Sequence, residues 1–306
     1  MKKLKHCPLC NGTRFHPVRG FDIKPPPEVY ARLGLPDTVS WWAVCKTCGF
    51  FFQNPRPTTE AILNIYAKGI YRQDREYDEQ FFLDRYDRPL GHLDWCGRHV
   101  ELQQKLRILD IGAGYGGAVR AFRDRGNEAV GIELDGSLIE MAENRYNVDL
   151  VQTSIEDTKL EPESFDLIYS SHVHEHFDDF SAINRKLYTL LSPGGHLLCI
   201  LPTYRLSPHG YRFANVFHNS MFTAVSLHNM FVQAGLAPVR IMYPLHESLP
   251  EVWGVATKPA HGMPTAFKND WWRFVAAELR LAPPVMRFYY RHLFRYAYRL
   301  QRDRVF

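Results

Sequence analysis

The stretch LRILDIGAGYGG, from Leu106 to Gly117, joins an apolar segment directly to a turn that contains three spaced glycines. Its apolar residues suit a strand in the centre of a sheet. Gly112, Gly114 and Gly116 then permit a sharp turn and let a ligand lie close to the backbone. A strand, a glycine-rich turn and a helix start in this order are typical of several nucleotide-binding folds, so the rest of the chain must decide between them.

Strand-like and helix-like segments alternate after this stretch. We predict strands at residues 106–111, 128–133, 148–152, 165–171, 195–201, 238–244 and 251–257. We predict helices at residues 116–125, 137–145, 178–190 and 223–234, the third of them closed by Ser192-Pro193-Gly194-Gly195. Such alternation makes a parallel, doubly wound sheet, and the last two strands suggest an antiparallel pair at its edge. The predicted fold class is therefore α/β, with a Rossmann-like, mostly parallel sheet of seven strands.

Four parts are predicted along the chain: a small zinc-ribbon-like module at residues 1–57, a helical connector at 58–100, the α/β domain at 101–258 and a helical tail at 259–306. The connector is expected to begin at an N-cap, Thr58 or Thr59. Within the α/β domain, residues 202–221 are too long for an ordinary connection and are expected to line the substrate.

The 306 residues carry a net charge of +4 and contain no run of about 18 apolar residues that could span a bilayer. The start MKKLKHCPLC also lacks the apolar segment of a signal peptide, so we expect a soluble, cytoplasmic protein. The basic residues gather in the tail, where eight arginines between 271 and 306 outnumber Glu278 and Asp303. This aromatic, basic tail either packs on the main domain or on a partner chain of a homo-oligomer, or contacts an anionic membrane surface or a phosphate-bearing substrate.

The cysteines pair as Cys7-x-x-Cys10 and Cys45-x-x-Cys48, which gives four thiolates in two knuckles. This spacing is typical of a tetrahedral zinc site and of a reducing compartment rather than a disulfide framework. A site whose four positions are all filled by the protein has no room to activate water. We therefore predict a structural zinc that serves folding or recognition.

Four motifs of the α/β domain occur in order: LRILDIGAGYGG (106–117), AVGIELD (129–135), SFDLIYSSHVHEHFDD (164–179) and LYTLLSPGGHLLCILP (187–202). In this order and spacing, residues 100–257 resemble the class I S-adenosylmethionine-dependent methyltransferases. The resemblance implies S-adenosylmethionine as the cofactor and methyl transfer as the reaction. An antiparallel hairpin at the edge of the sheet is also what that fold implies.

Each cofactor contact can be carried over from the resemblance onto this sequence. Asp110, Gly112, Ala113 and Gly114 would lie around the methionine end of the cofactor, and Tyr77 or Tyr71 would reach its carboxylate. Glu133 would hold the ribose, and Ser154 and Ile155 would lie at the adenine. Ser171 would face the reactive methyl group. Many family members have an acidic residue where Ser154 stands. The role of Glu133 also has a direct physical basis, because a carboxylate at a strand tip can accept both ribose hydroxyls.

A cluster of histidines follows the strand predicted at 165–171, at the edge where an open α/β sheet binds its ligand. A hydroxyl that accepts a methyl group benefits from a base, and an imidazole suits that task. The candidate catalytic residues are His174, Glu175, His176 and, from the long loop, His218. Two other roles for the cluster stay open: bracing of the loop, and the divalent ion associated with the positions of His172, Glu175 and His176 in ubiquinone O-methyltransferases.

An N-terminal zinc module ahead of such a domain is similar to the arrangement in sugar C-methyltransferases and related O-methyltransferases. The C-methylating enzymes tend to carry a further C-terminal domain that this chain lacks, which favours O-methylation of a sugar, a nucleotide sugar or another small polar metabolite. Sugar C-methylation is one alternative, and a zinc-ribbon protein that binds or modifies nucleic acid is another. The slightly acidic remainder of the chain and SSHVHEH in place of an Asn/Asp-Pro-Pro-Tyr motif both disfavour nucleic acid.

Overall fold

The computed structural model describes residues 2–18, 42–69, 78–204, 217–244, 250–260, 267–270 and 275. Tyr71, Tyr77, the middle of the predicted substrate loop and nearly all of the predicted tail lie outside the described residues. No helix in the described part of the chain has both the length and the apolar character needed to cross a membrane.

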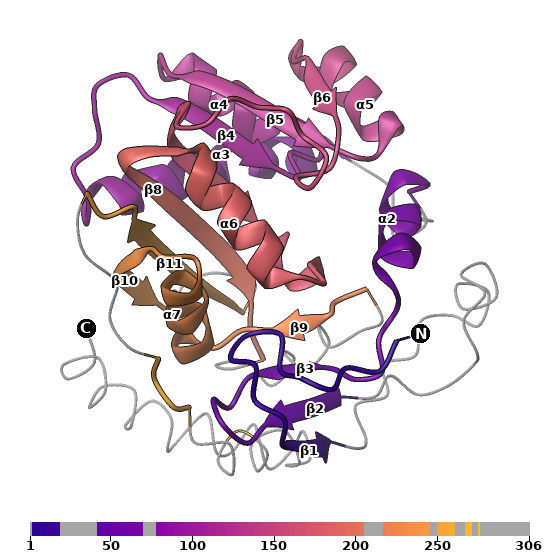
Figure 1. The fold of residues 1–306 in the computed structure, drawn as a ribbon. Helices are drawn as coiled ribbons and strands as arrows, with labels where there is room; N and C mark the ends of the chain where they lie inside the picture. Colours follow the sequence, from indigo (N-terminus) through magenta and orange to yellow (C-terminus); the bar gives the residue numbers. More distant parts are fainter. Residues whose placement is uncertain are drawn as a thin grey trace.

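Seven strands form the central sheet in the order β10-β11-β8-β7-β4-β5-β6 (Figure 1). Their bounds are β4 Arg107–Ile111, β5 Glu128–Glu133, β6 Leu150–Gln152, β7 Phe165–Ser171, β8 Leu191–Pro202, β10 Ala237–Met242 and β11 Glu251–Thr257. From β8 to β6 the neighbours are parallel, whereas β11 runs antiparallel to both β8 and β10. The predicted α/β fold is confirmed, including the antiparallel pair at the edge.

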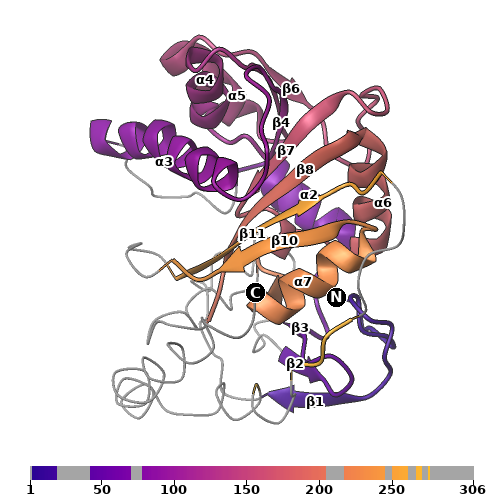
Figure 2. The ribbon, with the colours of Figure 1, turned by 90° about the vertical axis from the view of Figure 1, so that its left-hand side faces the viewer.

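Helices cover both faces of this sheet. Figure 2 shows α3 (Glu79–Gly97), α4 (Gly117–Asp124) and α5 (Gly136–Tyr146) on one side, and α6 (Phe180–Leu190) and α7 (Ala224–Gln233) on the other. Each face of the sheet has its own apolar core, because the side chains of consecutive strand residues point to opposite faces. Asp135, Asp179 and Thr223 begin α5, α6 and α7 by accepting a backbone N–H of the first turn.

One predicted boundary differs. We expected Ser192-Pro193-Gly194-Gly195 to form a turn before a strand that starts at 195, but β8 already begins at Leu191. The pairing of β7 with β8 shifts register between Phe165 and Leu167, so the extra residues of β8 are accommodated as an irregularity at its start. Gly194, with φ of +78°, permits this local bend.

A second sheet contains β1 (Phe15–Val18), β2 (Trp42–Cys45), β3 (Phe51–Gln53) and β9 (Ser220–Met221), in the order β1-β2-β3-β9. We call residues 2–18 and 42–56 the cysteine module. The fourth strand of this sheet, β9, lies outside the module, in the segment just before α7. The sequence did not reveal this strand. The short helix α2 (Thr59–Ala67) follows the module, and its N-cap is Thr58, one of the two residues predicted.

The cysteine module shares the apolar core on the α6 and α7 side of the main sheet. Phe50 packs against Phe180 of α6 and against Phe222, with ring centroids 5.8 and 5.3 Å apart. Leu9 and Phe52 belong to the same buried cluster. Because residues of both sheets belong to one buried apolar cluster, the two sheets pack against each other.

Candidate active site

The loop between β4 and α4 has the backbone geometry that its glycines predict. Gly112, Gly114 and Gly116 have φ values of +64°, +55° and +74°, in the left-handed region that side chains disfavour. A Cβ on Gly112 would lie 2.7 Å from Cγ2 of Val173, whereas a Cβ on Gly114 would meet nothing closer than a carbonyl oxygen at 4.0 Å. The loop therefore turns its backbone at Gly114 toward open space, where a ligand can approach it closely.

Glu133 lies at the carboxyl end of β5, beside this loop. Its carboxylate accepts the N–H of Gly114 at 2.8 Å, of Leu134 at 2.7 Å and of Asp135 at 3.0 Å. The residue is 8% exposed, and this burial raises its pKa against the lowering effect of the three hydrogen bonds. The result is an acidic group held rigidly next to the glycine loop.

The other cofactor candidates lie along the same edge of the sheet. Asp110 is buried near the end of β4. This burial and, to a smaller extent, the charge of Glu133 raise the pKa of Asp110 well above its usual range. The N–H of Ala113 donates to Ile132 O at 2.9 Å, which ties the glycine loop to β5. The buried Ile155 follows β6, and the half-buried Ser171 ends β7.

Ser154 is buried, and its hydroxyl is already engaged. Its Oγ donates to Oδ2 of Asp157 at 2.8 Å and accepts the N–H of the same residue at 3.1 Å. This closes a local turn after β6. The side chain thus shapes the turn where the adenine is expected, while its backbone remains at the edge of the sheet.

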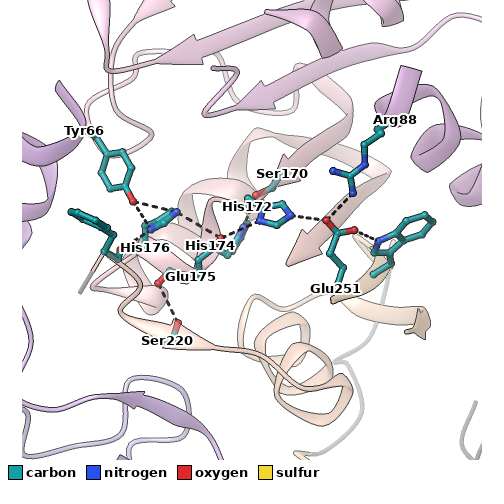
Figure 3. Close-up of polar contacts among 11 residues, drawn as sticks. Tyr66, Arg88, Ser170, His172, His174, Glu175, His176, Ser220 and Glu251 are labelled. Carbon is teal, nitrogen blue, oxygen red and sulfur yellow. Dashed lines mark hydrogen bonds and ion pairs between the residues drawn. The ribbon is translucent and has the colours of Figure 1, made fainter. Parts of the chain in front are cut away.

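The histidine loop, which we define as His172–Asp178, follows β7. Strand β7 is the neighbour of β4, and the order of the strands reverses between these two. His172 opens the histidine loop with φ of +57°. Its Nε2 lies 2.7 Å from Oε1 of Glu251, which is buried at the start of β11 (Figure 3). In doubly wound sheets, ligands bind at such a reversal.

Glu251 is fixed from two further directions. Arg88 of α3 donates to its Oε1 at 2.8 Å, and the indole N–H of Trp253 donates to its Oε2 at 2.9 Å. Burial would raise the pKa of Glu251, but the hydrogen bond and charge of His172 and the charge of Arg88 lower it to about 2. Glu251 is therefore an ionised group that orients the imidazole of His172.

Glu175 is the most unusual member of the loop. Its side chain is 0% exposed, and neither carboxylate oxygen has a hydrogen-bond partner among the described residues. Two imidazole nitrogens lie close to it, Nε2 of His176 at 3.6 Å and Nδ1 of His172 at 3.8 Å. A buried carboxylate needs polar neighbours, and these two side chains provide them.

His176 connects the loop to two other segments. Its Nδ1 lies 2.7 Å from the hydroxyl of Tyr66 on α2 and 2.8 Å from the carbonyl oxygen of Phe217. Its ring is 4.8 Å from that of His218. Ligand atoms of Glu175, His176 and His218 all lie within 4.8 Å of one another, a spacing that can hold a cation.

His174 occupies a different environment. It is completely buried, its Nδ1 lies 2.7 Å from Oγ of Ser170, and burial lowers its pKa to about 3. Its Nε2 has no hydrogen-bond partner within the described part of the chain. These surroundings favour bracing of the loop over the proton transfer that the sequence suggested for this residue.

The structure therefore brings Glu175, His176 and His218 together and adds residues that the sequence analysis missed. These are Tyr66, Arg88 and Glu251 (Figure 3). A carboxylate at the first position of an otherwise mostly apolar strand was the available signal for Glu251. Nothing in the sequence linked it to a histidine 79 positions earlier.

The four cysteines of the module also converge. Their Sγ atoms lie within 4.8 Å of one another, with 3.6 Å between Cys10 and Cys45 and 3.9 Å between Cys7 and Cys48. Tetrahedral bonds of about 2.3 Å to zinc place sulfur atoms roughly 3.8 Å apart. The donor set and the spacing both fit a zinc ion.

Comparisons with known proteins agree with this arrangement. The model of a family described as a methyltransferase domain matches residues 79–241, more than half of the chain. The ubiquinone biosynthesis O-methyltransferase of Stutzerimonas stutzeri is 30% identical over 128 residues, which are 40% of this chain and 54% of that protein. The malonyl-[acyl-carrier protein] O-methyltransferase of Enterobacter lignolyticus is 35% identical over 135 residues, or 39% of this chain and 53% of that protein. The chain thus spans about half the length of these relatives.

A solved structure supports the fold alone. A chain from a Haloferax volcanii complex that contains the Trm112 methyltransferase activator aligns with a TM-score of 0.50 at 15% identity. The alignment covers 59% of this chain and 94% of that one.

Proposed function

The chain belongs to the methyltransferase-domain family, and from this premise we propose that it transfers a methyl group from S-adenosylmethionine to an oxygen atom of a small polar acceptor. A sugar or nucleotide sugar is the acceptor class we propose. The names of the two curated relatives, both O-methyltransferases, support oxygen as the accepting atom. The single observation that carries the proposal is the His172–Glu251 pair beside the glycine loop, because it is an oriented base at the ligand-binding edge of the sheet.

The cofactor would lie along the carboxyl ends of β4, β5 and β6. Glu133 would accept its ribose hydroxyls, and the backbone at Gly114 would leave room for its methionine part. S-adenosylmethionine supplies a methyl group on a sulfonium, which a nucleophilic oxygen can attack. The protein's contribution is then to align the acceptor and to remove its proton.

We assign the proton to Nδ1 of His172. Glu251 accepts the hydrogen on Nε2, which leaves Nδ1 as the basic nitrogen. When the acceptor oxygen takes the methyl group, its hydroxyl proton would pass to Nδ1. The resulting imidazolium would lie between the carboxylates of Glu251 and Glu175, both of which would stabilise its charge.

Glu175, His176 and His218 would form the wall against which the acceptor binds. His176 and His218 come from different segments, and Tyr66 closes this wall from α2. We propose that His176 and His218 hydrogen-bond acceptor hydroxyls, while His174 braces the loop from within the core. Their donor and acceptor atoms suit a ligand rich in hydroxyl groups.

Methyl-labelled S-adenosylmethionine and a panel of sugars, nucleotide sugars and phenols would test this function. We expect label on an acceptor oxygen, identified by mass spectrometry, together with an equal amount of S-adenosylhomocysteine. Label on carbon would support sugar C-methylation instead. Failure of the intact protein to bind S-adenosylmethionine in calorimetry would refute the proposal as a whole.

We also propose that Cys7, Cys10, Cys45 and Cys48 bind one structural zinc ion. The supporting observations are the four converging sulfur atoms and the knuckle bond from Gly49 N to Cys45 O at 2.9 Å. Elemental analysis is expected to give about one zinc per chain. Cys45→Ala should reduce the content at least tenfold because it removes one of four ligands.

Cys96→Ala provides the matched control for zinc binding. Cys96 is as fully buried as Cys45 but lies on α3, outside the cluster. This variant should keep its zinc. Equal zinc content in the two variants, or none in the unaltered protein, would contradict the assignment.

A further inference from the structure

Asn219 joins the cysteine module to the histidine loop. Its carbonyl oxygen accepts the N–H of Gln53, at the end of β3, at 2.9 Å. Its own N–H donates to Glu175 O at 2.8 Å, and its side-chain Nδ2 donates to His176 O at 2.7 Å. Asn219 is completely buried, so these bonds are shielded from competing water.

A second connection reaches the other end of the histidine loop. Arg56 of the module forms an ion pair with Asp178, and their side chains are 1% and 5% exposed. Arg56 also donates to the carbonyl oxygen of Asp178 at 2.6 Å, and Thr59 donates to its carboxylate at 2.7 Å. The segment from Glu175 to Asp178 is therefore held at its start by Asn219, which bonds to the module, and at its end by Arg56 of the module and by Thr59.

The cluster of four cysteines is connected to these contacts through β3. The knuckle that carries Cys45 and Cys48 leads directly into this strand, and Cys45 N donates to Phe50 O at 2.9 Å. Strand β3 then pairs with β9, with Phe51 opposite Met221. Asn219 immediately precedes β9, so the position of the knuckle determines where Asn219 meets the loop.

We propose that the metal-loaded cysteine module positions the histidine loop, and that Asn219 is the positioning residue that couples the two. Zinc on the four thiolates holds the knuckle, the knuckle holds β3 in register with β9, and Asn219 then fixes the backbone of Glu175 and His176. This inference rests on the proposed function only in treating the histidine loop as the catalytic part of the site. The coupling itself can be measured without an acceptor.

Asn219→Ala in the full chain is the direct test, because it removes the side-chain bond to His176 and leaves the backbone bonds in place. Hydrogen–deuterium exchange of residues 172–178 should become about tenfold faster, as expected for the loss of one hydrogen bond. The His176 ring signal should shift in NMR spectra of histidine-labelled protein. Zinc content and the affinity for S-adenosylhomocysteine should stay within twofold.

Asn229→Ala is the matched control. Asn229 is equally buried and also bonds backbone groups, donating to Lys268 O and accepting Lys268 N, both at 2.7 Å. These bonds join α7 to residues 267–270 rather than to the histidine loop. The control should leave exchange at residues 172–178 and the His176 signal unchanged. If both variants alter the loop equally, or if neither does, the proposal is wrong.

Removal of zinc from the unaltered protein by a chelator tests the other end of the connection. Exchange should increase at residues 172–178 and 217–223, while the glycine loop at 110–117 keeps its protection. An unchanged histidine loop after verified loss of zinc would overturn the proposal. Lost protection at the glycine loop would overturn it too, because the metal would then support the whole fold. If the loop responds as expected but no methyl acceptor is found, the proposed function fails while the coupling stands.

Discussion

Replacement of Glu133 with alanine is expected to weaken S-adenosylmethionine binding at least 100-fold. Glu133 is the carboxylate that fixes Gly114 and would accept the two ribose hydroxyls. Hydrogen bonds to a charged group contribute about 1.5–3 kcal/mol each, and a factor of ten in affinity corresponds to about 1.4 kcal/mol. Two lost bonds therefore account for a loss of this size, which isothermal titration calorimetry would measure.

Glu128→Ala is the control for this prediction. Glu128 is the first residue of the same strand, at the end opposite Glu133, where it is exposed and paired with Lys105. Its replacement should leave the affinity within twofold. Thermal unfolding of both variants would show that the sheet is intact. An unaltered affinity in a folded Glu133→Ala protein would remove Glu133 from the cofactor site.

Replacement of His172 with glutamine is expected to lower kcat by 10²- to 10⁴-fold, the usual contribution of a positioned base. Glutamine retains hydrogen-bonding groups but cannot take up the acceptor proton. Affinity for S-adenosylmethionine should be unchanged, because the defect lies on the acceptor side. The measurement is the initial rate with the acceptor found by label transfer.

His196→Gln is the matched substitution. His196 lies on β8 opposite Leu167, near the start of β7, whereas the histidine loop follows the end of β7. Its Nδ1 lies 2.9 Å from Oγ1 of Thr257. Its kcat should remain within twofold of the unaltered protein. If His176→Gln abolishes turnover and His172→Gln does not, the base is His176, which contacts Tyr66 and Phe217.

The features predicted best from the sequence are those encoded by neighbouring residues. The glycine loop, the strand that ends at Glu133 and the N-cap at Thr58 each depend on a few consecutive side chains, and their geometry is as expected. The order of strands and helices followed from the same local signals. The start of β8 was misplaced because pairing with β7 extends the strand through a Pro-Gly-Gly turn signal.

The features that could not be predicted depend on residues far apart in the chain. Glu251 meets His172 only because β11 and β7 both pair with β8, and Tyr66 meets His176 only because α2 folds back against the loop. The two residues of β9 carry no strand pattern of their own, so their pairing with β3 was invisible. The environment of His174 could not be anticipated either, because three histidines within five residues look alike in a sequence.

The apolar contact between Phe50, Phe180 and Phe222 has a consequence for protein engineering. The unit that contains the four cysteines is discontinuous in sequence, since it is completed by a strand and an aromatic side chain that come about 170 residues later. A chimera that exchanges only the first 57 residues with those of a related protein would leave β9 and Phe222 facing a foreign surface. A workable exchange must therefore transfer residues 217–223 together with the N-terminal part.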